Sequence, residues 1–141
     1  MSEEPAKPSA VVPSLIAALV CDVACKDPVT AKVNLIGIFN KLWAQRFPTA
    51  RPMSLYFKIA DAQGFYKVSV AFVQLETGKV VLEASGEASI TDRLESADSF
   101  ISFPPVPFSA PGRYEFQIFA NGVFIGGAVI DVALSQPTAK G

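Results

Sequence analysis

Apolar and polar residues alternate with a period of two along most of this chain, and this alternation most limits how it can fold. The clearest case runs from Lys79 to Ile90, where every second residue is apolar or small and most residues between them are Glu or Ser. A strand with one buried and one solvated face has this pattern, because successive side chains point to opposite faces of a sheet. No segment of the sequence shows the 3.6-residue period of a long amphipathic helix. We therefore predict an all-β chain.

Turn residues divide the chain into strands and indicate which neighbours form hairpins. The Asn121-Gly122 pair is the strongest indication, because a type I′ turn needs positive φ at both central residues. Thr77-Gly78 is also suited to a short hairpin loop, and a Lys-Asp-Pro-Val-Thr turn occupies residues 26–30. The predicted hairpins are 14–25 with 31–40, 65–76 with 79–90, and 113–120 with 123–132.

The remaining segments complete the predicted architecture. Residues 53–60 alternate in the same way and are expected to form a three-stranded meander with the 65–76 and 79–90 strands. The first hairpin is apolar on both faces, so we expect it to be central in its sheet, and a less regular strand lies near 99–103. Longer connections at 41–52 and 91–112 pass between sheets, and the prolines of the second restrict it to an edge or a loop. We predict an antiparallel immunoglobulin-like β-sandwich of about eight strands.

We expect a single domain at residues 14–133 between disordered tails at 1–13 and 134–141. An apolar stretch at residues 10–21 resembles part of a secretion signal. Acidic residues precede it, at Glu3 and Glu4, and Asp22 interrupts it well short of the ~20 residues that span a bilayer. The expected location is therefore cytoplasmic, without a membrane partner.

The composition removes several classes of chemistry. The chain has no histidine, so it lacks the usual general base and zinc ligand. Cys21 and Cys25 are too few for a structural zinc site and too far apart along a strand for a disulfide, so we expect two buried, reduced thiols. With 12 basic and 13 acidic residues, the net charge of -1 offers no attraction to nucleic acid. We expect no enzyme activity, no metal, no cofactor and no nucleic-acid partner.

Two acidic groups have alternative interpretations. Asp22 interrupts an apolar strand, so it could be a buried carboxylate or a metal ligand, but a solvent-facing position is the preferred interpretation. Asp92, Glu95 and Asp98 could gather a calcium ion. Their spacing matches no EF-hand loop and Arg93 lies among them, so we prefer a solvated turn.

The 41–52 connection holds the candidate ligand site. Trp43, Arg46, Phe47 and Arg51 form a basic and aromatic group that could bind an anionic or planar ligand by stacking and bidentate contacts. The alternative is that Trp43 covers one end of the core.

Three further residues are assigned structural roles. Tyr114 follows Pro111-Gly112 and resembles the tyrosine corner of immunoglobulin-like sandwiches, in which the hydroxyl bonds to nearby backbone. Asn121 and Gly122 form the predicted type I′ turn. Gly126-Gly127 indicates a bulge or a close approach of two backbones rather than a phosphate loop.

The chain has more apolar strand surface than one core needs, which indicates an interface. The last predicted strand carries bulky apolar residues on both faces, and the proline-rich segment adds three phenylalanines. The alternative for that segment is that its phenylalanines fold back onto the sandwich edge. We predict a noncatalytic interaction or structural module that forms a homo-oligomer or binds a protein partner. The other hypothesis is a small-molecule or anion-binding module that uses the 41–52 crossover. The candidate interface residues are Phe100, Phe103, Phe108, Phe119 and Phe124.

Several motifs together resemble those of a bacterial family of small domains of unknown function. They are a Cys-Asp strand at residues 21–22, LIGIF at 35–39, F-P-x-x-x-P at 47–52 and PF-x-x-PG-x-Y at 107–114. The resemblance covers about residues 15–132 and implies a β-sandwich without supplying an activity. The chain departs from the pattern at Val23 and Ala24, where relatives often carry polar residues.

Overall fold

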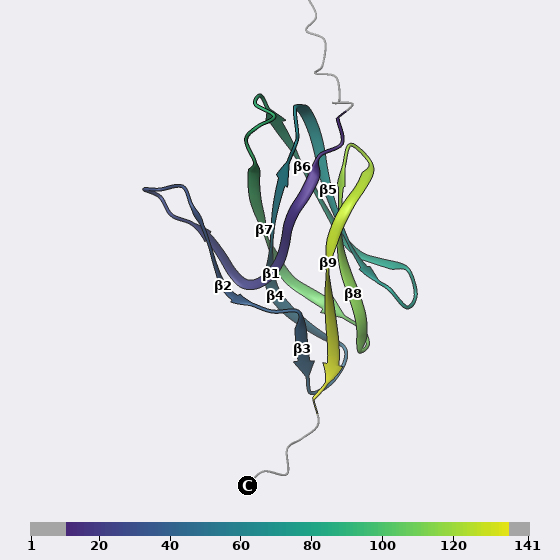
Figure 1. Cartoon of the computed structure of the whole chain (residues 1–141). Helices are drawn as coiled ribbons and strands as arrows, with labels where there is room; N and C mark the ends of the chain where they lie inside the picture. The colour runs from purple at the N-terminus through teal and green to yellow at the C-terminus, as the bar shows by residue number, and fades with distance from the viewer. Residues whose placement is uncertain (1–10, 136–141) are drawn as a thin grey trace, which may run out of the picture.

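The computed structural model describes residues 11–135, and these form two β-sheets packed face to face without a helix (Figure 1). The described chain contains nine strands, whereas about eight were predicted. In chain order they are β1 (Ser14–Lys26), β2 (Val33–Ile38), β3 (Lys41–Ala44), β4 (Thr49–Ala60), β5 (Gly64–Gln74), β6 (Lys79–Ile90), β7 (Ala97–Phe108), β8 (Gly112–Ala120) and β9 (Val123–Leu134).

The strand order is β2-β1-β4-β7 in one sheet and β3-β9-β8-β5-β6 in the other. All pairs are antiparallel except β3 with β9, which is parallel. The prediction of an all-β sandwich is therefore confirmed. The β3 strand of this parallel pair was not predicted. It lies within the 41–52 segment, which was expected to be only a connection.

The three predicted hairpins are all present, as β1–β2, β5–β6 and β8–β9. At the β8–β9 turn, Asn121 has φ of 49° and Gly122 has φ of 80°, the positive values that this turn requires. The Asn121 side chain also accepts a hydrogen bond from the Lys67 amide at 2.8 Å and donates one to the Phe65 carbonyl at 3.3 Å. The turn is thereby attached to β5.

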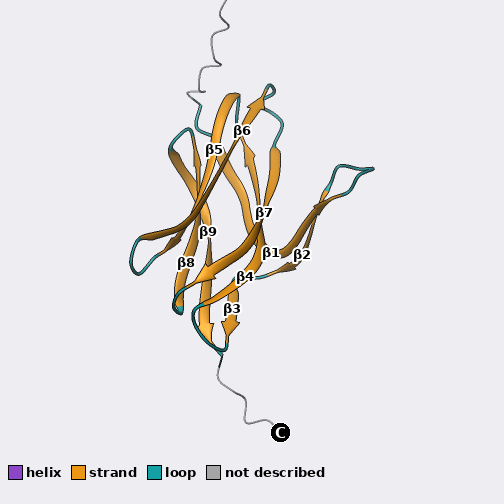
Figure 2. Cartoon of the chain, turned by 180° about the vertical axis from the view of Figure 1, so that it is seen from behind, coloured by secondary structure: helices purple, strands orange, loops and turns teal. Residues whose placement is uncertain are grey.

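Two predictions about strand neighbours are wrong. The β4 strand does not form a meander with β5 and β6, because it pairs with β1 and β7 in the opposite sheet. The β2 strand is not central but lies at an edge, and its hairpin with the end of β1 projects from the sandwich (Figure 2). Alternation shows which way a side chain points, but it does not identify the neighbouring strand.

Aromatic rings fill the centre of the core. Phe72 stacks on Tyr114 with ring centroids 5.5 Å apart, and it also contacts Phe108 and Phe116. Phe103 stacks on Phe116. Phe103 and Phe108 are therefore core residues, so their assignment to an interface is wrong and the alternative, that they fold back onto the sandwich, is confirmed for these two. They point inward because β7 pairs with β4, while the neighbouring prolines are exposed.

The ordered domain is slightly longer than predicted. Pro13 is buried, and the Val11 carbonyl accepts a 2.8 Å hydrogen bond from the Tyr66 hydroxyl, so residues 11–13 pack on the domain. At the other end Leu134 belongs to β9, and the Ser135 amide donates to the Ala44 carbonyl at 2.7 Å. The rest of the two predicted tails, residues 1–10 and 136–141, lies outside the described residues.

Candidate functional site

The 41–52 crossover is held at one end of the sandwich by contacts with both sheets (Figure 1). The Asn40 carbonyl accepts a hydrogen bond from the Asp131 amide at 2.9 Å, and β3 then runs parallel to the end of β9. The Phe47 side chain packs against the core, which anchors the turn before β4. The chain therefore returns from the five-stranded to the four-stranded sheet along a fixed route.

Alternation within β3 places Lys41 and Trp43 on the outer face. Leu42 packs against the core and Ala44 is buried. The Lys41 ammonium lies 4.5 Å from the centroid of the Trp43 ring, within the range of a cation–π contact. The Trp43 side chain is 56% exposed, so the alternative that it covers the core is wrong.

The turn and the start of β4 add two arginines beside this ring. The Arg51 guanidinium donates from Nη2 to the Trp43 carbonyl at 3.1 Å. Trp43, Arg46 and Arg51 line one depression of about 450 Å³, together with Gln45, Thr49 and Ser135. The structure thus brings together the three residues that were predicted as a ligand site.

A second depression, of about 510 Å³, adjoins the first and shares Trp43 and Arg51 with it. Lys41 and Asp22 also line it. The sequence prediction missed Lys41, although its position two residues before Trp43 would have placed both on one face had a strand been assigned there.

A different surface lies along the side of the sandwich where β1 and β9 face each other. Pairing with β2 covers only residues 21–26 of β1, and pairing with β3 covers only residues 131–134 of β9. Within the described chain, residues 14–19 and 123–130 therefore each have one edge without a ladder partner, and the Val20 carbonyl accepts a hydrogen bond from the Phe39 amide at 2.9 Å. Leu19, Ile38 and Val129 help to line a depression of about 380 Å³ between them. We call β2 and these two unpaired segments the open side.

The open side differs in composition from the opposite side of the sandwich. The edge strand β6 carries Lys79, Glu83 and Glu87, and the edge strand β7 contains three prolines. Charge and proline are the usual means by which proteins prevent edge strands from pairing with other chains. The open side contains no charged residue and no proline in residues 14–19, 33–38 or 123–130.

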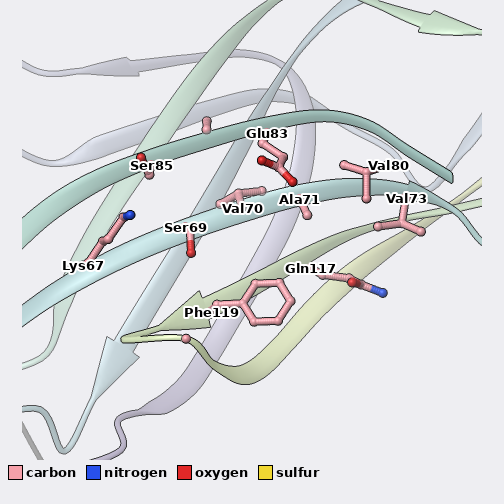
Figure 3. Close-up of a pocket in the computed structure, with 12 residues that line it drawn as sticks. Lys67, Ser69, Val70, Ala71, Val73, Val80, Glu83, Ser85, Gln117 and Phe119 are labelled. Carbon is pink, nitrogen blue, oxygen red and sulfur yellow. The ribbon is translucent and has the colours of Figure 1, made fainter. Parts of the chain in front are cut away.

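A depression of about 700 Å³ lies on the outer face of the five-stranded sheet (Figure 3). Small side chains at Ser69, Ala71 and Ser85 hollow the sheet between larger neighbours. Phe119 lines the depression, and its ring contacts that of Phe124 at a centroid distance of 5.7 Å. Phe124 is 53% exposed, so this pair of predicted interface residues connects the depression with the open side.

Phe100, the remaining predicted interface residue, is half-buried in β7, where it lies opposite Tyr56 of β4. The Tyr56 hydroxyl donates to Asp98 at 2.9 Å. Partial burial raises the pKa of Tyr56, and its hydrogen bond to the Asp98 carboxylate raises it further.

The acidic groups do not gather. In the described chain no group of three His, Cys, Asp or Glu side chains is placed to hold a metal ion. Asp22 is exposed, and Asp92 accepts a hydrogen bond from the Leu94 amide within its own turn.

The two cysteines differ in exposure. Both are free thiols, but only Cys21 is buried, so the expectation of two buried thiols is wrong for Cys25. Burial raises the pKa of the Cys21 thiol, and the charge of Asp22 raises it further.

The Tyr114 side chain is fully buried, and its hydroxyl donates to the Ala110 carbonyl at 2.7 Å. Gly127 lies against the backbone of Phe116 on β8, so the glycine pair marks a close approach of two strands, as predicted.

Similarity to known proteins is found among family profiles and among solved structures. The profile of a family of unknown function, DUF6941, matches residues 16–133. A search of curated proteins found no match. Among solved structures, an immunoglobulin-like protein from Pseudomonas aeruginosa aligns with 94% of this chain and 99% of its own, at 6% identity and a TM-score of 0.39. No helix in residues 11–135 is long and apolar enough to cross a membrane.

Proposed function

We propose that this chain, which belongs to DUF6941, a family of unknown function, is a noncatalytic protein-interaction module that uses its open side. The observation that carries the proposal is the contrast between strand edges. On one side of the sandwich the edge strands β6 and β7 are rich in charge and proline. The open side instead presents unpaired backbone groups and uncharged residues. An edge that lacks charge and proline accepts a strand from another chain most readily where it is regular, and the pairing of β2 contains no register shift, unlike the β1–β4 and β8–β9 pairings.

The exposed apolar side chains of the open side and its borders support an interface of ordinary size. Eight large apolar residues of β1, β2 and β9 are between 38% and 59% exposed: Ile16, Leu19, Val23, Ile36, Ile38, Val123, Phe124 and Val129. The transfer free energy of such a side chain, divided by the free energy per unit of apolar area, gives the apolar area that the side chain can expose. A half-exposed side chain then contributes about 50 Å², and the eight together contribute about 400 Å². A standard interface covers about 800 Å² per partner, of which roughly 60% is apolar. The apolar area is therefore close to what one partner needs.

A second copy of the chain is the partner we propose. In a two-fold dimer, each copy presents the same surface to the other, so an uncharged surface brings no like charges together. Two-fold dimers are also the commonest oligomers. The free edges of β2 in two copies could pair and extend the four-stranded sheet, with the exposed apolar side chains of β1 and β9 beside them. Because the exposed apolar area is slightly below that of a standard interface, we expect association in the micromolar range.

Light scattering over a range of concentrations tests the proposal. At about 10–100 μM the mass should exceed the 15.0 kDa of one chain. Phe124→Ser and Ile36→Lys should lower it, because both side chains are more than half exposed on the open side or its border. Leu94→Ser is the matched control, since Leu94 is 94% exposed in the loop between β6 and β7.

Two outcomes would count against the proposal. A mass of 15.0 kDa at every concentration would exclude the second copy. If Leu94→Ser lowered the mass as much as Phe124→Ser, the association would be nonspecific and the open side would not be the interface.

A further inference from the structure

We propose that the basic cluster formed by Lys41, Arg46 and Arg51 around Trp43 binds a small anion whose phosphate or carboxylate is attached to a planar ring. This site lies at the crossover end of the sandwich and is independent of the partner proposed for the open side (Figure 1).

The cluster concentrates positive charge on a chain whose net charge is -1. Within residues 11–135, the ion pair formed is that of Arg113 with Asp131, and the three cations of the cluster have no carboxylate partner there. Asp131 lies opposite Lys41 in the β3–β9 ladder, but its carboxylate accepts from Arg113 Nε at 2.9 Å. The positive charge of the cluster therefore remains available to an anion.

Carboxylates around the cluster are few. Asp22 is the acidic residue that lines the second depression, next to Lys41 and Trp43. The first depression, which contains both arginines, has no acidic residue among its described lining. An anionic group should therefore bind on the Arg46 and Arg51 side of the indole rather than on the Asp22 side.

Trp43 supplies a surface for a planar ring. More than half of its side chain is exposed, although the Lys41 ammonium lies over the indole. Aromatic rings stack in offset contact and gain from it beyond the area they bury. The first depression is lined by polar groups, whereas apolar side chains line the second around the indole. A ring that stacks on the indole in the second depression would direct its attached anion toward Arg51, which lines both, and toward Arg46 in the first.

Arg51 is already positioned for this role. Its hydrogen bond to the Trp43 carbonyl uses one of the five N–H groups of the guanidinium and leaves the others for a ligand. A guanidinium pairs with phosphate or carboxylate through two parallel hydrogen bonds. The volume of about 450 Å³ lies within the usual range of small-ligand sites, which is about 300–1,000 Å³.

Intrinsic fluorescence tests this inference directly, because Trp43 is the single tryptophan of the chain. The purified protein is titrated at constant ionic strength with adenosine monophosphate, benzoate, adenosine and inorganic phosphate, with excitation chosen to avoid absorption by the ring. Adenosine monophosphate or benzoate should give a saturable change with half-saturation below about 1 mM. Adenosine lacks the anion and inorganic phosphate lacks the ring, so each should require at least about tenfold more.

Matched variants separate a specific site from general quenching. Arg46→Gln removes an exposed charge, and we expect it to raise the half-saturating concentration about tenfold without altering thermal unfolding. Arg51→Gln should raise it by at least as much. Arg93→Gln removes the same charge from the exposed β6–β7 loop and should leave the titration unchanged.

The outcomes that overturn the inference are distinct. If none of the four compounds gives a saturable change up to about 10 mM, no such site exists. If adenosine binds as tightly as adenosine monophosphate, the anion makes no contribution. If Arg93→Gln weakens binding as much as Arg46→Gln, the effect reflects net charge and not this cluster.

Discussion

Gly127→Ala is predicted to destabilise the domain strongly, whereas Gly86→Ala should not. Both glycines lie in strands, and neither has a positive φ, so an alanine backbone fits at both. A Cβ at Gly127 would overlap the carbonyl oxygen of Phe116 and lie 3.2 Å from its carbonyl carbon. A Cβ at Gly86 would have nothing within 4 Å. The pair therefore isolates the effect of one close contact.

The expected magnitude follows from what must move. The obstacle at Gly127 is backbone in the adjacent strand β8, which cannot shift without disturbing the β8–β9 ladder. Overpacking typically costs about 1–3 kcal/mol, and one weakened ladder hydrogen bond adds about 1 kcal/mol. We therefore expect a loss of about 2–4 kcal/mol. For a domain of this size that lowers the midpoint of thermal unfolding by about 7–15 °C.

Thermal and urea unfolding of the two variants and the parent provide the assay. Gly86→Ala should lie within about 0.5 kcal/mol of the parent, or be slightly more stable because alanine restricts the unfolded chain. If the two variants unfold at the same midpoint, the contact between Gly127 and the Phe116 backbone does not exclude a side chain at position 127, and the reasoning is refuted.

Three further predictions concern polar side chains. Tyr114→Phe should lower stability by about 1–2 kcal/mol in urea unfolding, because it removes a buried hydroxyl and leaves a backbone acceptor unpaired; an unchanged midpoint would contradict this. In the native protein Cys25 should react rapidly with a thiol reagent while Cys21 stays protected, and both should react after denaturation; two fast thiols in the native state would be the contrary result. The raised pKa of Tyr56 implies that its contribution to stability is complete below pH 10 and declines as the pH rises through its folded-state value. In an absorbance titration, Asp98→Asn should lower the pH at which Tyr56 ionises; a titration that Asp98→Asn leaves unchanged would refute the contribution of Asp98.

The hairpins and the inward-facing residues follow from local pattern. Asn121-Gly122 specifies its turn because few residue pairs accept two positive φ values, and this is independent of the rest of the fold. The alternation of β6 likewise identifies its two faces. These features could be predicted because they depend on residues only a few positions apart.

The candidate binding site could be predicted only in part. Trp43, Arg46 and Arg51 lie within nine residues of one another, so their proximity was foreseeable from the sequence. The contribution of Lys41 was not, because it depends on the strand conformation of residues 41–44, which comes from pairing with β9 far along the chain. Phe103 and Phe108 were misassigned because the strand predicted near 99–103 continues through the prolines to Phe108 and pairs with β4.

The sequence by itself determined that the chain is built from strands and where its hairpins turn, since backbone geometry and side-chain period act locally. Only the tertiary structure decided which hairpins share a sheet and which edges are left open. The β4 and β5 strands are neighbours in sequence but belong to opposite sheets, and β1 meets β9 from the far end of the chain. Such pairings depend on the fit of whole sheets against one core, because each strand offers the same hydrogen-bonding groups to any neighbour. The open side forms for this reason. Its residues have the pattern of ordinary strand residues, and only the arrangement of the sheets leaves their edges without a partner strand.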